Sequence, residues 1–202
     1  IEQQEVFVTA SIGIAIYPND GDDAETLMMA AESALYSAKA DGRNLYKYYA
    51  HEMNEMGNQL FKLERMLRLA LERNEFSVAY QPQINATSGQ LVGVEALLRW
   101  QNPELGNVSP VQFIPVAEET HLIIDIGEWV LAETCRQLHL WETQGLPAIT
   151  VSVNISTRHF LQPDMVSRLH NIVQEAGIAP SRICIEVTEG AMQDVDAALA
   201  LL

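Results

Sequence analysis

One strand-like segment of the sequence carries two charged residues that could do chemistry. The segment VGVEALLRW, residues 92–100, alternates so that Val94 and Ala96 fall on one face while Glu95 and Arg99 fall on the other. A carboxylate inside a buried strand costs several kcal/mol unless a cation or hydrogen-bond donors meet it. The pattern therefore predicts one of two arrangements: Arg99 forms a structural ion pair with Glu95, or Glu95 binds a ligand such as a metal ion.

Two further strand-like segments each offer an oxygen ligand near their C-terminal end. Asn154 lies on the polar face of ITVSVNIS, residues 149–156, and Glu186 lies on the polar face of ICIEVTE, residues 183–189. Either residue alone would be interpreted as a polar group that caps a loop after a strand. Together with Glu95 they provide two carboxylates and one amide oxygen, which suit a hard cation such as Mg²⁺, Mn²⁺ or Ca²⁺.

A repeated order of strands and helices is expected to position these residues. A short connection joins the strands at 76–82 and 92–100, which predicts an antiparallel pair. After that pair, strands alternate with helices, which predicts parallel strands wrapped by helices in an α/β fold with its chemistry at the C-terminal rim. The expected strands are 6–16, 45–49, 76–82, 92–100, 149–156 and 182–189, and the expected helices are 23–40, 59–73, 110–119, 125–144, 162–176 and one that begins near Val195.

Composition limits the classes of function. The chain has 202 residues, 48% of them hydrophobic, and its 27 acidic and 12 basic residues give a net charge of −15, which disfavours a nucleic-acid surface. Cys135 and Cys184 stand in no disulfide or metal-ligand spacing, so we expect reduced core residues of a cytoplasmic protein or of the cytoplasmic part of a membrane-anchored sensor. No apolar run approaches the roughly 20 residues that span a bilayer, so we expect no direct membrane contact.

Four motifs stand in order along the chain: YQPQI, GVEALLRWQNPELGNVSPVQFIPVAEET, VSVNIS and IEVTEG. Together they resemble the first half of an EAL domain, the cyclic di-GMP phosphodiesterase barrel. The resemblance covers residues 59–202 and implies a partial TIM-like (β/α) barrel of EAL type with an antiparallel first strand pair. Residues 1–49, through TASIGIAIYPNDG and ALYSAKADGRN, resemble the C-terminal piece of an α/β GGDEF diguanylate cyclase domain, which leaves 50–58 as a linker.

The resemblance implies a reaction, its cofactors and a set of site residues. The reaction is metal-dependent hydrolysis of cyclic di-GMP to linear pGpG in bacterial second-messenger signalling, with Mg²⁺ or Mn²⁺ as cofactor and Ca²⁺ as an ion that binds but inhibits. The implied partners are cyclic di-GMP and a second copy of the chain, in a homodimer through the EAL domain. The residues carried over are Glu95 and Glu189 as catalytic residues, Glu95, Asn154 and Glu186 as metal ligands, Gln81 and Arg99 as substrate-binding residues, and Lys39 and Arg43 as nucleotide phosphate contacts in the cyclase-like part.

Other interpretations remain open beside this one. A catalytically silent receptor would bind cyclic di-GMP and signal to partners, but such a receptor need not keep Glu95, Asn154 and Glu186 as metal ligands. A structural dimerisation module would have no affinity for the dinucleotide. For Lys39 and Arg43 the residues themselves favour a simpler role, because cations near a helix C-terminus stabilise its dipole without any ligand.

We predict that the 202-residue chain alone does not turn over cyclic di-GMP. A complete (β/α)₈ barrel takes about 250 residues, and the remaining acidic and lysine residues of an EAL site are expected beyond Leu202. The last strand would also present an unpaired edge, which favours aggregation. The purified chain, incubated with cyclic di-GMP and Mn²⁺, should release no pGpG. Clear metal-dependent release of pGpG would contradict this prediction.

Overall fold

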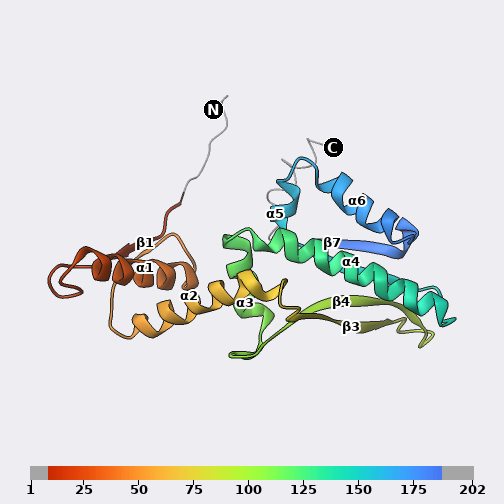
Figure 1. The fold of residues 1–202 in the computed structure, drawn as a ribbon, viewed down its shortest axis with the longest axis horizontal. Coiled ribbons are helices and arrows are strands. Elements are labelled where there is room, and N and C mark those ends of the chain that lie inside the picture. The colour runs from red at the N-terminus through yellow and green to blue at the C-terminus, as the bar shows by residue number, and fades with distance from the viewer. Residues whose placement is uncertain (1–8, 188–202) are drawn as a thin grey trace. The chain divides into compact units, whose positions relative to one another are not determined.

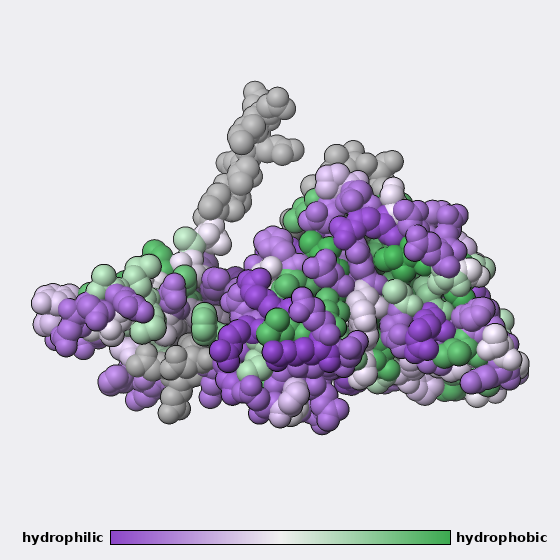
Figure 2. Space-filling view, in the orientation of Figure 1, coloured by the Kyte–Doolittle hydropathy of each residue, from purple (hydrophilic) through white to green (hydrophobic). Residues whose placement is uncertain are grey.

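The computed structural model describes residues 9–187, with the side chains of 54–58 left out, and consists of two compact units that divide between Leu63 and Glu64. Figure 2 shows hydrophilic residues over much of the visible face of each unit, in line with the net charge of −15. None of the helices in the described part of the chain is long and apolar enough to cross a membrane.

The N-terminal unit contains one helix packed on a pair of short parallel strands (Figure 1). The strands are β1, Ile12–Ile14, and β2, Tyr46–Tyr48, and the helix between them is α1, Ala24–Ala40. Gly13 is required at their contact, because a Cβ atom there would lie 2.0 Å from the carbonyl oxygen of Ala31 on α1. These elements confirm the predicted order, although β1 is shorter than the described part of the predicted strand 6–16.

A long helix, α2, Met53–Ala70, contains residues of both units. It begins and ends earlier than the predicted helix 59–73, so part of the segment 50–58, which was expected to be a linker, is helical. The sequence MNEMGN lacks an apolar stripe, but helix propagation adds one backbone hydrogen bond per residue and does not need one. Within the second unit, Leu67 and Ala70 are buried, three residues apart on one face of the helix.

The second unit contains a mixed sheet with the strand order β3-β4-β6-β7, and β5 pairs with the far end of β4. The β3–β4 pair is antiparallel, whereas β4–β6 and β6–β7 are parallel, which confirms both predictions of strand direction. The short strand β5 was not predicted, because three residues carry no measurable periodicity. The strands are β3, Phe76–Ile84, β4, Leu91–Asn102, β5, Gly106–Val108, β6, Thr150–Ile155, and β7, Ile183–Val187.

Helices of the second unit follow the strands as the alternating pattern predicts. Helix α4 packs against β3, β4 and β6, where β6 contributes the fully buried Val151 and Val153. Burial of each such side chain contributes about 1.5–3 kcal/mol. The expected helix near Val195 lies outside the described residues. The helices are α3, Pro110–Glu119, α4, Leu122–Thr143, α5, Thr157–Phe160, and α6, Met165–Glu175, with a 3₁₀ turn at Pro180–Arg182.

The two cysteines do not both belong to the core. Cys135 is buried on α4, and burial raises the pKa of its thiol to about 11, as expected for an inert core residue. Cys184 is exposed, which contradicts the prediction of a core residue. The reason is its place on β7, the last strand of the described sheet, which pairs with β6 on one side.

We predict that Gly127→Ala destabilises the protein, although alanine normally favours a helix. A Cβ atom at Gly127 of α4 would lie 2.6 Å from Cε1 and 2.7 Å from Nε2 of His159. The imidazole is buried and its Nε2 lies 3.1 Å from the carbonyl oxygen of Ile124, so it cannot retreat without loss of that contact. Overpacking of this kind costs about 1–3 kcal/mol.

Urea denaturation of the parent and the Gly127→Ala variant measures this cost. Without the close contact, the substitution would stabilise α4 by about 1 kcal/mol through helix propensity. Ala132→Gly, at an exposed position of the same helix, is the matched control for propensity alone. A Gly127→Ala variant more stable than the parent would show that the contact with His159 is wrong.

Candidate functional site

Glu95 and Asn154 meet at the junction of β4 and β6. Glu95 pairs in register with Ser152, so Asn154 lies two residues further along β6, on the same face of the sheet. The amide Nδ2 of Asn154 donates a hydrogen bond of 2.8 Å to Oε1 of Glu95. The donor that satisfies the half-buried carboxylate is therefore a neighbouring strand's amide, which keeps two oxygen-bearing side chains side by side.

Glu186 continues the same row onto β7. It is the direct register partner of Asn154, and adjacent strands lie roughly 4.8 Å apart. Carboxylate, amide and carboxylate thus follow one another across three parallel strands, near the C-terminal ends of β6 and β7 and near the point where β4 stops pairing with β6. Residues 9–187 contain no group of three or more His, Cys, Asp and Glu side chains that could hold a metal ion. The row itself has two carboxylates and one amide, a donor set that fits a hard cation which keeps water or ligand oxygens in its remaining positions.

Arg99 does not neutralise Glu95. The two residues share a face of β4, but four residues of strand separate them by about 13 Å, beyond ion-pair distance. Arg99 is exposed, and its Nη1 donates instead to the carbonyl oxygen of Leu98 at 2.9 Å. The structural ion pair that the sequence allowed is therefore wrong, and the guanidinium remains available to an anionic ligand.

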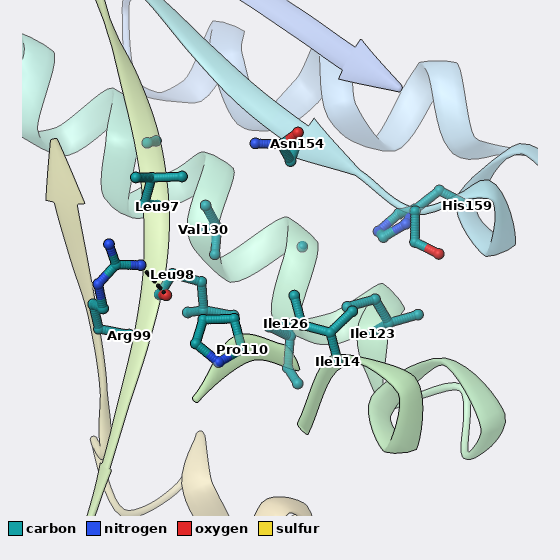
Figure 3. Close-up of a pocket in the computed structure, with 13 residues that line it drawn as sticks. Leu97, Leu98, Arg99, Pro110, Ile114, Ile123, Ile126, Val130, Asn154 and His159 are labelled. Carbon is teal, nitrogen blue, oxygen red and sulfur yellow. Dashed lines mark hydrogen bonds between the residues drawn. The ribbon is translucent and has the colours of Figure 1, made fainter. Parts of the chain in front are cut away.

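A pocket of about 220 Å³ lies between Arg99 and Asn154 (Figure 3). It forms where the pairing of β4 with β6 ends at Ala96, so that the two strands part and leave α4 as the floor. The volume is below the roughly 300–1,000 Å³ of pockets for drug-sized molecules, so one ring system fits rather than a whole dinucleotide. Apolar side chains dominate the lining, among them Leu97, Leu98, Pro110, Ile114, Ile123, Ile126 and Val130.

The other predicted site residues have different positions. Gln81 on β3 is exposed and is the register partner of Glu95, so it stands beside the row of Glu95, Asn154 and Glu186. Glu189 lies outside the described residues. Lys39, in the last turn of α1, and Arg43, at a φ of 60° just after it, belong to the N-terminal unit. Their position at a helix C-terminus is the one expected for cations that interact with the helix dipole.

Two further residues of the site were not predicted. Ser156 lies directly after β6, caps α5 by accepting from the backbone N–H of Arg158, and donates to Oε1 of Glu118 at 2.7 Å. This bond ties the end of α3 to the loop that follows Asn154. The serine before a short helix is a weak capping signal in the sequence. No sequence signal identifies Glu118 as its partner, because the two residues are far apart along the chain.

His159 is a buried polar residue on the wall of the pocket. It is 2% exposed, and its Nδ1 has no hydrogen-bond partner among the described residues. Burial lowers the pKa of its imidazole, while contact with the backbone at Ile124 and the charge of Glu128 act in the opposite direction. Glu128 is itself held by a two-point ion pair with Arg168, whose charge also lowers the pKa of His159. The imidazole is therefore neutral near pH 7.

Family models match both parts of the chain. The model of the EAL domain matches residues 64–202, and the model described as diguanylate cyclase, GGDEF domain, matches residues 1–45. The boundary at residue 64 coincides with the division between the two compact units.

Curated bacterial proteins are similar to the chain over nearly its whole length. The bifunctional diguanylate cyclase/cyclic di-GMP phosphodiesterase MucR of Pseudomonas aeruginosa is 44% identical, and the match covers 100% of this chain and 30% of MucR. The cyclic di-GMP phosphodiesterase PdeR of Escherichia coli is 35% identical, with 95% of this chain and 29% of PdeR covered. The chain spans less than a third of the length of these relatives.

Solved structures share the fold. The phosphodiesterase part of MucR in complex with c-di-GMP superimposes with a TM-score of 0.65 at 44% identity, covering 70% of this chain and 57% of that one. The EAL enzyme Bd1971 in its cAMP and cyclic-di-GMP bound form gives a TM-score of 0.66 at 26% identity, covering 90% and 48%. These matches confirm the predicted fold class.

We predict that the buried His159 makes stability fall at acid pH. Above the ordinary pKa of 6.5, the imidazole is neutral in the folded and the unfolded chain. Between that value and the lower pKa of the folded state, the unfolded chain binds a proton that the folded chain does not, so stability falls as pH falls. Melting temperatures from about pH 8 to about pH 5 should decline more steeply for the parent than for His159→Phe. Equal slopes for both proteins would contradict the prediction.

Proposed function

The chain belongs to the EAL domain family, and from this premise we propose that the full-length protein hydrolyses cyclic di-GMP to linear pGpG. In this reaction a water oxygen bonds to one phosphorus, the bond from that phosphorus to the O3′ atom breaks, and the leaving oxygen takes a proton. The observation that carries the proposal is the row of Glu95, Asn154 and Glu186 across neighbouring parallel strands, joined by the 2.8 Å bond from Asn154 to Glu95.

Different residues of the chain would bind and orient the ligand. Arg99 is exposed at the edge of the pocket and can hold a phosphate through two parallel hydrogen bonds. The apolar pocket beside it excludes water from one ring system of the ligand. Gln81, next to Glu95 in the sheet, offers an amide to the dinucleotide. Glu189 is kept as a catalytic residue that would support the active-site loop rather than hold metal.

Two divalent ions are the proposed cofactors, and Mg²⁺ or Mn²⁺ fits the donors better than a soft metal. Glu95, Asn154 and Glu186 would hold them, because hard cations prefer carboxylate and amide oxygens. When bound, such ions supply Lewis acidity toward a phosphoryl oxygen and toward water. Ca²⁺ shares the same ligands but favours larger and more flexible coordination, so we propose that it binds and inhibits.

The domain boundaries and the setting of the protein are part of the proposal. We keep 1–49 as the end of a GGDEF domain and 59–202 as the first half of the EAL domain, with 50–58 as a connection that α2 makes partly helical. The match of family models to residues 1–45 and 64–202 supports this division. Lys39 and Arg43 are candidate phosphate contacts of the cyclase-like part. A cytoplasmic homodimer through the EAL domain is the proposed state.

A catalytically silent receptor for cyclic di-GMP is the second candidate function. It would use Arg99 and the apolar pocket in the same way, and these two features by themselves favour binding rather than turnover. The carboxylates of Glu95 and Glu186 favour the enzyme, because two negative charges beside a phosphate site oppose ligand binding unless a cation lies between them. Calorimetric titration with cyclic di-GMP and Ca²⁺, followed by an assay for pGpG with Mn²⁺, separates receptor, enzyme and a protein that binds no ligand.

We predict that Glu95→Gln in the full-length protein abolishes most hydrolysis and weakens divalent-metal binding but leaves the fold intact. The glutamine oxygen can still accept from Asn154, so this contact survives, while the negative charge that attracts the cation is lost. Glu72→Gln, at an exposed position of the same unit, should change neither property.

Thermal melts with and without Mn²⁺ accompany the assay of Glu95→Gln. The melting temperature of the parent should rise when the metal is added, because a ligand that binds the folded state stabilises it. The variant should gain much less. A variant that keeps near-normal specific activity and the full metal-dependent gain would rule out Glu95 as a ligand.

A further inference from the structure

A buried carboxylate stands directly behind the strand end that carries Arg99. Glu75, just before β3, is 8% exposed, and no ion pair with it occurs among the described residues. Its Oε2 accepts hydrogen bonds from Nε1 of Trp100 and from Nδ2 of Asn102, both at 2.9 Å. Its Oε1 has no partner among the described residues. A carboxylate in this state is costly, so its presence calls for a reason beyond packing.

Glu75 holds the last three residues of β4 together. Its backbone carbonyl accepts from the N–H of Gln101 at 2.9 Å, between the two side-chain bonds to Trp100 and Asn102. Oδ1 of Asn102 in turn accepts from the N–H groups of the following turn, at 2.9 Å and 3.0 Å, which closes the connection to β5. Glu75 thus anchors the strand end, and Asn102, which it holds, anchors the turn after it.

Trp100 is fixed at its apolar body as well as at its polar tip. The indole is 1% exposed, and its ring lies 6.0 Å from that of Phe76 and 5.4 Å, edge to face, from that of Phe113. Side chains alternate along a strand, so a fixed inward Trp100 forces Arg99 to the opposite face. That face is the one that carries Glu95, and Figure 3 shows the Arg99 side chain on the other side of β4 from Pro110, which lines the pocket.

We propose that Glu75 is a positioning residue for Arg99: through the Trp100 indole it fixes the end of β4 so that the guanidinium faces the ligand phosphate. The proposal rests on the proposed function, because it needs a phosphate for Arg99 to hold. The side-chain hydrogen bonds of Glu75 go to Trp100 and Asn102, neither of which is a proposed metal ligand. Its role is to remove freedom from the strand end, since a two-point phosphate contact requires a guanidinium whose direction is already set.

The first test is Glu75→Gln in the full-length protein. The substitution keeps size but replaces a charged acceptor with an amide, whose N–H₂ group adds donors where Trp100 and Asn102 already donate. The KM for cyclic di-GMP should rise by about tenfold while kcat changes by less than about twofold, because the binding geometry is disturbed and the metal ligands are not. Glu64→Gln is the matched control, since Glu64 is a partly exposed carboxylate on α2 that pairs with Arg68.

Trp100→Phe is the second variant, and it tests the positioning role of Glu75 even if Glu75→Gln does not fold. Phenylalanine keeps an aromatic ring in the cluster but removes the N–H that binds Glu75. It should also raise KM more than it lowers kcat, and combination with Glu75→Gln should add little, because both changes remove the same bond. A fall in melting temperature with unchanged KM in both variants would overturn the positioning role and leave a structural one.

A double-mutant cycle with Arg99→Ala links the effect to the arginine. In the Arg99→Ala background, Glu75→Gln should raise KM no further, because the group that it positions is gone. An equal increase in both backgrounds would overturn the proposal while the proposed function stands. A parent protein that neither binds nor hydrolyses cyclic di-GMP would overturn the proposed function, and the positioning role with it.

Discussion

The parallel pairing of β4 with β6 is the constraint on which the site depends. It joins four residues of each strand, Gly93–Ala96 with Thr150–Val153, and then ends. Within the paired segment, Glu95 lies opposite Ser152, two residues before Asn154. This spacing is close enough for the amide of Asn154 to donate to the carboxylate of Glu95. Where they part, the space between them becomes the apolar pocket. One feature of backbone pairing therefore produces both the row of oxygen-bearing side chains and the cavity next to it.

The C-terminal end of β4 is held in place by other contacts. Beyond Ala96 it no longer pairs with β6, and it is held by β3, by β5 and by the buried carboxylate of Glu75. A strand end without such a partner frays, and its side chains sample more than one direction. The Met66 sulfur on α2 lies 3.5 Å from Nδ2 of Asn102, so this helix also contacts the group of side chains that holds the strand.

Periodicity alone predicted much of this structure, and its failures have physical reasons. The alternation of side chains along each strand correctly predicted that Glu95 and Asn154 lie on one side of the sheet. It also allowed an ion pair between Arg99 and Glu95, because a period of two indicates the face of a strand but not the distance along the strand. The hydrogen bond from Asn154 depends on strand register, which no single segment encodes. The burial of His159 depends on Gly127, a contact between helices that are distant in sequence.

Charge explains why the proposed ligand and the proposed metal would depend on each other in this protein. A chain with a net charge of −15 repels an anionic dinucleotide, and two of its carboxylates lie in the row beside the pocket. Arg99 supplies a single positive charge beside two carboxylates, so it does not by itself make the local field positive. A divalent cation between carboxylates and phosphate reverses the sign of the local field. The site therefore suits a phosphorylated ligand when the cation is bound, and metal affinity and ligand affinity should rise and fall together.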